Sequence, residues 1–190
     1  MTARWLTAAL LFATSFVVAH AQSHKNTAPE SFRANGQITS AAGGAASAIE
    51  IKIERYSSDT EHAAFAAALK SGGNDAILAE LKKAPAIGEV KVGARTIPVR
   101  WARQNPKGDS RRIIVVTDAP VFFAGAGAVD AKPTAGFDLA VVEFTIDSVG
   151  LGNGTMAPAA HVKAGGPAGV QVADYSGKLI TLVTVSRNLS

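Results

Sequence analysis

The longest alternation of apolar and polar positions in the chain runs from Asp138 to Asp147. Every second side chain is apolar, which is the period of a β-strand with one buried face and one partly solvated face. The buried face is predicted to consist of Ala140, Val142, Phe144 and Ile146. We therefore expect a strand here, and we expect the rest of the fold to pack against it.

Shorter segments with strand character lie on both sides of this one. Strands are predicted at residues 49–56, 89–92, 96–101, 112–117 and 178–185. The pair Gly93-Ala94 joins two of them and suits a type II′ hairpin, because glycine readily takes positive φ at its first position. The stretch Ala41–Ala48 is expected to be a loop, because its small side chains offer little to pack.

The period changes to that of a helix after the first clear strand. Ser58 followed by Glu61 forms a capping box before an alanine-rich segment. Gly72-Gly73 is predicted to end this helix, and a second short helix is predicted from Asn74 to Pro85. The predicted class is α+β, with a mainly antiparallel sheet (a sandwich or partial barrel) and a two-helix excursion between the early strands.

The N-terminus predicts export. A short positive start, the apolar run Trp5–Ala19 and Ala19-His20-Ala21 are typical of a signal peptide spanning residues 1–21. Residues 22–30 are expected to form a disordered lead, and residues 31–190 a single domain without a further apolar run long enough to span a membrane. The chain contains no cysteine, so no disulfide stabilises it. We expect a periplasmic or secreted protein.

The sequence lacks the motifs of several catalytic and metal-binding chemistries. No serine stands in a Gly-x-Ser-x-Gly frame, and the histidines beyond the leader, His24, His62 and His161, have no motif spacing. The sequence therefore predicts no catalytic residue, no metal site and no cofactor. The glycines of the run Gly150–Gly154 are interpreted as backbone positions that need positive φ.

Charge suggests one candidate surface. The formal net charge of +4 is only mildly basic and does not indicate a nucleic-acid partner. Guanidinium groups bind carboxylates or phosphates, and an aromatic ring can stack beside them. The hypothesis is a binding surface for an anionic lipid or polysaccharide of the cell envelope, made by Arg95, Arg100, Trp101, Arg103, Arg111 and Arg112. The other interpretation is a solvated face with Trp101 packed beside Ile97 and Val99.

Two segments carry a resemblance to other proteins. Residues 97–103, Ile-Pro-Val-Arg-Trp-Ala-Arg, and residues 130–152 resemble small exported bacterial proteins of unknown function, of the acidobacterial type. The resemblance implies a bacterial, extracytoplasmic setting and brings no activity, ligand or catalytic residue. Taken together, the sequence favours a non-enzymatic binding or envelope-associated module. The alternative is an extracytoplasmic hydrolase with a site assembled from loops around the 138–147 strand. The ligand and the oligomeric state are left open.

Overall fold

The computed structural model describes residues 27–40, 43–122 and 134–188. The expected signal peptide and residues 22–26 of the expected lead lie outside these ranges, whereas residues 27–30 lie within them. The elements are β1 (Glu30–Ser40), β2 (Gly43–Ile53), α1 (Asp59–Lys83), β3 (Gly88–Val92), β4 (Arg95–Lys107), β5 (Ser110–Thr117), β6 (Leu139–Ile146), β7 (Leu151–Ala164), β8 (Val170–Tyr175) and β9 (Ile180–Asn188).

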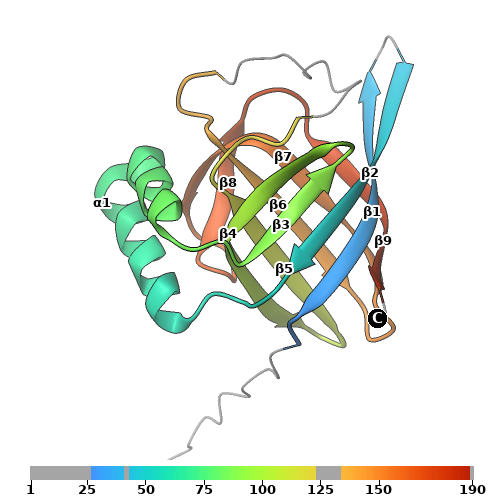
Figure 1. Cartoon of the computed structure of the whole chain (residues 1–190), viewed down its shortest axis with the longest axis horizontal. Helices are drawn as coiled ribbons and strands as arrows, with labels where there is room; N and C mark the ends of the chain where they lie inside the picture. The colour runs from blue at the N-terminus through green and yellow to red at the C-terminus, as the bar shows by residue number, and fades with distance from the viewer. Residues whose placement is uncertain (1–26, 41–42, 123–133, 189–190) are drawn as a thin grey trace, which may run out of the picture.

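Eight of the strands close into an antiparallel barrel (Figure 1). β1 to β7 pair in chain order, except that α1 lies between β2 and β3, and β9 then pairs with both β7 and β1. β7 is long enough to serve two purposes. Its first part pairs with β6 and β9, and its last part, Ala160–Ala164, pairs with β8, with Ala160 also opposite Leu139 of β6.

The predicted fold class is therefore wrong in its architecture, although the mainly antiparallel β content is confirmed. The sheet is a closed barrel instead of a sandwich or partial barrel, and the excursion is one bent helical element instead of two helices. The bend occurs at Gly73, whose φ of 61° and ψ of −141° lie outside the helical range. Because one glycine absorbs the change of direction, α1 continues to Lys83 without an intervening loop.

The barrel interior is filled with aliphatic side chains and two phenylalanines. The predicted buried face of the 138–147 strand is confirmed, because Ala140, Val142, Phe144 and Ile146 all lie in this interior core. Phe144 meets Phe32 of β1 edge-on, with ring centroids 4.9 Å apart. An eight-stranded barrel has an interior just wide enough for side chains to fill, so this core leaves the barrel solid.

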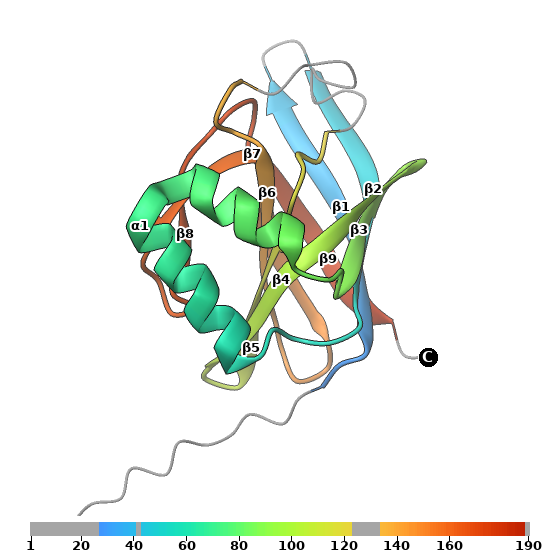
Figure 2. The same cartoon turned by 60° about the vertical axis from the view of Figure 1, so that its left-hand side comes forward.

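A second core lies outside the barrel, where α1 covers one side of it (Figure 2). The helix contributes Phe65, Ala68, Leu69, Ile77 and Leu81, and the barrel contributes outward-facing side chains such as Trp101, Ile114, Val116, Leu139 and Val141. β6 therefore buries both of its faces, one inside the barrel and one beneath the helix. Within the described ranges, no helix is both long enough and apolar enough to cross a membrane.

Candidate functional site

The N-terminal end of α1 is fixed by a capping box and by an ion pair to the segment that follows β2. The predicted capping box is confirmed: the Glu61 backbone N–H donates to Ser58 Oγ at 3.2 Å, and the Ser58 backbone N–H donates to Glu61 Oε2 at 2.7 Å. Arg55 donates to both carboxylate oxygens of Glu61, at 2.7 and 2.8 Å. This fork-like geometry fixes both partners in orientation as well as distance.

A β-bulge places Trp101 beneath the helix. The register of β4 against β5 shifts between Val99 and Trp101, so the inside–outside alternation of β4 changes there. Val99 belongs to the interior core, whereas Trp101 points outward, is 2% exposed and stacks on Phe65 of α1 with ring centroids 4.8 Å apart. The bulge thus directs a large aromatic side chain at the inner face of the helix.

The bend in α1 is anchored to the barrel by the side chain of Asn74. Its Nδ2 donates to Gly136 O at 2.7 Å and to Ala160 O at 3.3 Å, and its Oδ1 accepts from the Val162 backbone N–H at 3.1 Å. One amide therefore satisfies three backbone groups, one in the segment before β6 and two in β7. This anchoring fixes where the second arm of the helix starts.

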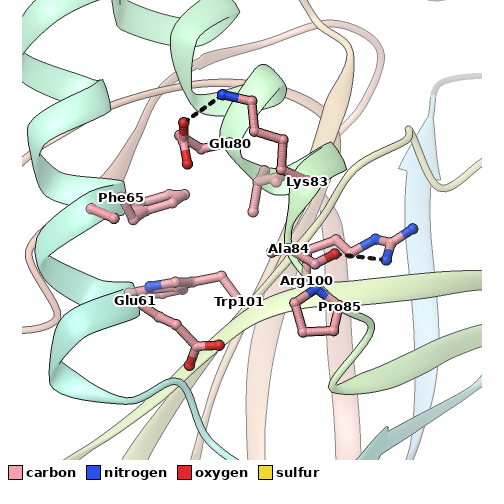
Figure 3. A pocket seen from close by; sticks show the side chains of 10 residues that line it. Glu61, Phe65, Glu80, Lys83, Ala84, Pro85, Arg100 and Trp101 are labelled. Atoms are coloured by element: carbon pink, nitrogen blue, oxygen red, sulfur yellow. Dashed lines mark hydrogen bonds and ion pairs between the residues drawn. The ribbon is translucent and has the colours of Figure 1, made fainter.

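A cavity of about 240 Å³ lies between the two arms of α1 and strand β4 (Figure 3). Its wall is mainly apolar: Phe65 and Trp101 lie on one side, and Ala84 and Pro85 lie where the helix ends. Four charged side chains stand at its rim, namely Glu61, Glu80, Lys83 and Arg100. The arrangement is an apolar recess with a charged border.

The charged groups of the border are engaged with neighbours. Lys83 Nζ lies 2.9 Å from Glu80 Oε1. Arg100 donates through Nε to Asp118 Oδ2 at 2.8 Å and through Nη1 to the carbonyl of Ala84 at 2.9 Å. The Arg100 contact to Ala84 connects the C-terminal end of α1 to β4 and so helps to define the cavity mouth.

Two titratable groups near the cavity have shifted pKa values. The hydrogen bonds from Arg55 are the main reason that the pKa of Glu61 falls from its ordinary 4.5 to about 2, with Ser58 adding to the effect and burial opposing it. Burial, aided by the charge of Arg103, lowers the pKa of His62, and Asp59 opposes that shift. At neutral pH the site therefore carries an ionised Glu61 and a neutral His62.

The structure distributes the arginines predicted from the sequence over several surroundings. Arg95 is exposed where β3 turns into β4, far along the strand from the bulge. Arg100 and Trp101 both line the cavity. Arg103 donates to Asp59 Oδ1 at 2.9 Å and to the carbonyl of Ser57 at 3.3 Å, beside the first turn of α1. Arg100, Trp101 and Arg103 thus lie near α1, and Arg95 is separate from them.

Arg111 and Arg112 point to opposite faces of β5. Arg111 faces the barrel interior at the end where β1 begins, and it pairs with Glu30 through both guanidinium nitrogens and both carboxylate oxygens. Tyr56, Gln104 and Thr27 accept further hydrogen bonds from it. We refer to Arg111, Glu30 and Tyr56 as the polar seal, because they close this end of the interior core.

Arg112 lies on the outer surface of the barrel. Its Nη2 pairs with Glu143 of the neighbouring strand β6. Its Nε is buried and has no hydrogen-bond partner in the described part of the chain. Arg111 and Arg112 therefore do not present one continuous basic surface, because neighbouring residues of a strand point to opposite faces.

The sequence did not indicate the apolar wall of the cavity as a site. Phe65 and Leu81 stand at apolar positions of the two helices that the sequence predicts. Such periodic apolar positions are typical of core packing, so the pattern alone could not distinguish a wall from a core. The sequence feature that pointed toward the cavity was Gly73 between two helical patterns. A bend at this glycine turns the packed faces of the two helical arms toward each other.

Comparisons with known proteins add nothing to this geometry. No protein-family model, no curated protein and no solved structure matches the chain. Within the described ranges, no group of three or more histidine or acidic side chains is placed to hold a metal ion.

Proposed function

We propose that this protein is a non-enzymatic binding module whose ligand site is the cavity between α1 and β4. The observation that carries the proposal is the apolar wall of that cavity, with Phe65 and Trp101 stacked at one side. Recesses of this kind, largely apolar with few polar groups at the border, are the usual form of small-molecule sites. The ligand that fits is a small, flat, apolar molecule.

The size of the cavity supports this class of ligand. At about 240 Å³ it is smaller than most drug-sized sites, which begin at roughly 300 Å³. It is nevertheless larger than the roughly 150 Å³ that is sufficient for benzene in an apolar cavity. A single aromatic ring with a short substituent therefore matches the available space.

The chemistry of the border supports binding over proton transfer. Glu61, with a pKa of about 2, stays ionised at neutral pH and is held by Arg55. A general acid or base works best when its pKa is near the working pH, so this carboxylate is poorly matched to that role. Because Glu61, Arg100 and Lys83 are already paired, they can frame an apolar ligand without needing a charge on it.

The test uses benzene as the probe and blocks the cavity with one substitution. Ala64 lines the cavity on an exposed position of α1, so Ala64→Phe places a ring in the recess. Ala67 is equally exposed on the same helix but does not line the cavity, so Ala67→Phe is the matched control. In an NMR titration, we expect benzene to shift the indole N–H signal of Trp101 saturably, with a Kd on the order of 1 mM.

The two variants then decide the location. Ala64→Phe should abolish the saturable shift, whereas Ala67→Phe should leave it unchanged. A response that neither substitution alters would place benzene elsewhere. The absence of any saturable response in the unmodified protein would overturn the proposal.

The wider expectations from the sequence stay proposals. We propose an exported protein in the periplasmic or secreted space of a bacterium, related to the small exported proteins that it resembles. An anionic lipid or polysaccharide of the envelope as partner remains a prediction, and Arg95 is the exposed arginine of the predicted set. The alternative of an extracytoplasmic hydrolase with a site in loops around β6 also remains a prediction.

A further inference from the structure

A second pocket, of about 270 Å³, lies at the end of the barrel where the β4–β5 and β6–β7 turns come together. It is separate from the cavity beneath α1, with which it shares no residue. Its lining is mainly polar and includes Asp109, Ser110, Arg111, Asp147, Ser148 and Arg187. Side chains from three parts of the chain, the two turns and the end of β9, therefore face one small space.

Arg187 brings a positive charge to this pocket. It lies opposite Phe32 in the β1–β9 register and is half-buried. In the described part of the chain, its guanidinium group has neither a hydrogen bond nor an ion pair. Arg111, which also lines the pocket, differs because Glu30 neutralises it.

The turn between β6 and β7 holds Arg187 in place without using its charge. The Arg187 backbone N–H donates to Gly150 O at 2.8 Å. Gly150 has a φ of 87°, and a Cβ at this position would lie 3.0 Å from Arg187 Cβ. Glycine therefore permits both the turn and the close approach of the Arg187 backbone. Because only the backbone of Arg187 contacts this turn through a hydrogen bond, its guanidinium group can face the pocket.

Two carboxylates line the same pocket. Asp147 Oδ1 accepts hydrogen bonds from the backbone N–H groups of Val149 at 3.0 Å and Leu151 at 2.9 Å, which fixes its position. Asp109 is exposed in the β4–β5 turn. Among the described residues, neither carboxylate forms an ion pair with Arg187 or with another cation. The pocket thus holds separate positive and negative groups that do not neutralise each other.

We propose that this pocket binds a small zwitterion, with the ligand carboxylate on Arg187 and its ammonium group facing Asp109 and Asp147. A guanidinium group binds a carboxylate through two parallel hydrogen bonds, and carboxylates bind ammonium groups as charge-assisted acceptors. A simple anion would meet the two aspartates as well as Arg187, and a simple cation would leave Arg187 without a partner. A ligand with both charges gains from both sides, and the hydroxyl groups of Ser110 and Ser148 provide further polar contacts.

The experiment compares zwitterions with their halves in the full chain. Backbone amide signals of residues 108–111 and 148–150 are followed by NMR during titration with glycine, 4-aminobutyrate, acetate and methylammonium. We expect saturable shifts with at least one of the two zwitterions, and an affinity at least about tenfold weaker for acetate and methylammonium. Glucose serves as a neutral polar probe that should not bind.

Variants then assign the two charges. Arg187→Gln and the exposed Asp109→Asn should each weaken zwitterion binding by about tenfold or more, whereas Arg95→Gln, at an exposed arginine elsewhere, should leave it unchanged. Asp109→Asn keeps the test valid if Arg187→Gln impairs folding. Equal binding of acetate and glycine, binding of glucose alone, no binding of either zwitterion, or binding unaffected by Asp109→Asn would overturn the proposal.

Discussion

The two hydrophobic cores of this protein differ in how completely they are packed and in whether their buried polar atoms have hydrogen-bond partners. The interior core of the barrel consists of apolar side chains and is closed at one end by the polar seal. The outer core beneath α1 borders a cavity and includes buried polar atoms without partners in the described ranges, such as Trp101 Nε1 and His62 Nδ1. The interior core behaves as a scaffold, and the outer core borders the cavity in which we propose that a ligand binds.

The geometry of the elements explains this difference. Interior side chains converge from all sides toward the barrel axis, so they interdigitate and fill the space. A bent helix on the curved outer surface of a barrel makes contact along each arm and leaves a gap where the arms diverge. Phe65 and Trp101 occupy part of that gap by stacking, and the remainder is the cavity.

The largest effect is expected from truncating the interior core. Phe144→Ala should lower the free energy of unfolding by about 3–5 kcal/mol, because closely packed neighbours such as Phe32 cannot collapse into the void. Thr145→Ala, the neighbouring position on the other face of β6, should change it by no more than about 0.5 kcal/mol. Denaturant unfolding of both variants measures the contrast. Similar small losses in both would show that the interior is not the rigid core.

Breaking the polar seal should have the next largest effect. Arg111→Met leaves the buried Glu30 carboxylate without its cation, and we expect a loss of about 3 kcal/mol at neutral pH. Adding Glu30→Gln to this variant should restore part of the loss, because no buried charge then remains. Denaturant unfolding of the single and double variants provides the comparison.

The pH dependence of Arg111→Met tests whether its lost stability comes from the buried charge of Glu30. In the unmodified protein, burial raises the pKa of Glu30, but hydrogen bonds from Arg111, Tyr56 and Thr27 outweigh it and the net pKa lies below the ordinary 4.5. Its contribution is therefore present above pH 4.5 and is lost as the pH falls below that value. Without Arg111, burial should raise the pKa instead, so acidification from pH 7 should narrow the difference in stability between Arg111→Met and the unmodified protein. A difference that stays the same or widens on acidification would contradict this account.

The smallest effect is expected in the outer core, from His62. Burial and Arg103 lower the pKa of His62 below its ordinary 6.5, so the folded protein binds fewer protons than the unfolded chain in that range. Stability should therefore decrease as the pH falls below 6.5, and His62→Gln should remove this decrease. Unfolding at pH 7.5 and 5.5 measures it, above the range in which Glu30 and Glu61 titrate. An unchanged decrease in the variant would assign the effect to another group.

Local signals allowed part of the fold to be predicted from the sequence. The buried face of β6 was readable because Phe144 and Ile146 alternate with the polar Glu143 and Thr145, and the Ser58–Glu61 capping box lies within one turn. The hairpin at Gly93 was predicted for the same reason, and its φ of 58° is that of the first position of a type II′ turn. These features depend on residues close together in the chain.

Non-local features could not be predicted in this way. The expectation of a loop at Ala41–Ala48 was wrong, because β2 begins at Gly43 and is held by its pairing with β1. Positive φ was expected throughout the Gly150–Gly154 run, but it occurs at Gly150 and not at Gly152 or Gly154. A Cβ on these last two would lie only 1.8 and 2.2 Å from carbonyl oxygens of β6, so they are glycines because β7 closes tightly onto β6.

The candidate site could not be predicted from the sequence because it depends on the bulge in β4. Regular alternation placed Trp101 beside Ile97 and Val99, and this interpretation was wrong because the bulge moves Trp101 to the outer core while the other two remain inside. A bulge depends on pairing with a neighbouring strand, so a single strand's pattern does not reveal it. The basic segment likewise could not reveal that Arg111 faces Glu30, which lies far away in sequence.

One hydrogen bond at the base of α1 bears on how the chain can be rearranged. The Glu54 backbone N–H donates to Ile87 O at 2.9 Å, so the chain leaves the barrel after β2 and returns before β3 at nearly the same point. The helical excursion is therefore an insertion whose two ends already meet, and the entropy of closing a loop there depends only weakly on its length. Such a junction is suited to exchange: a different insert could replace the helix while the barrel keeps its register, as long as the new element covers the outer core that α1 buries.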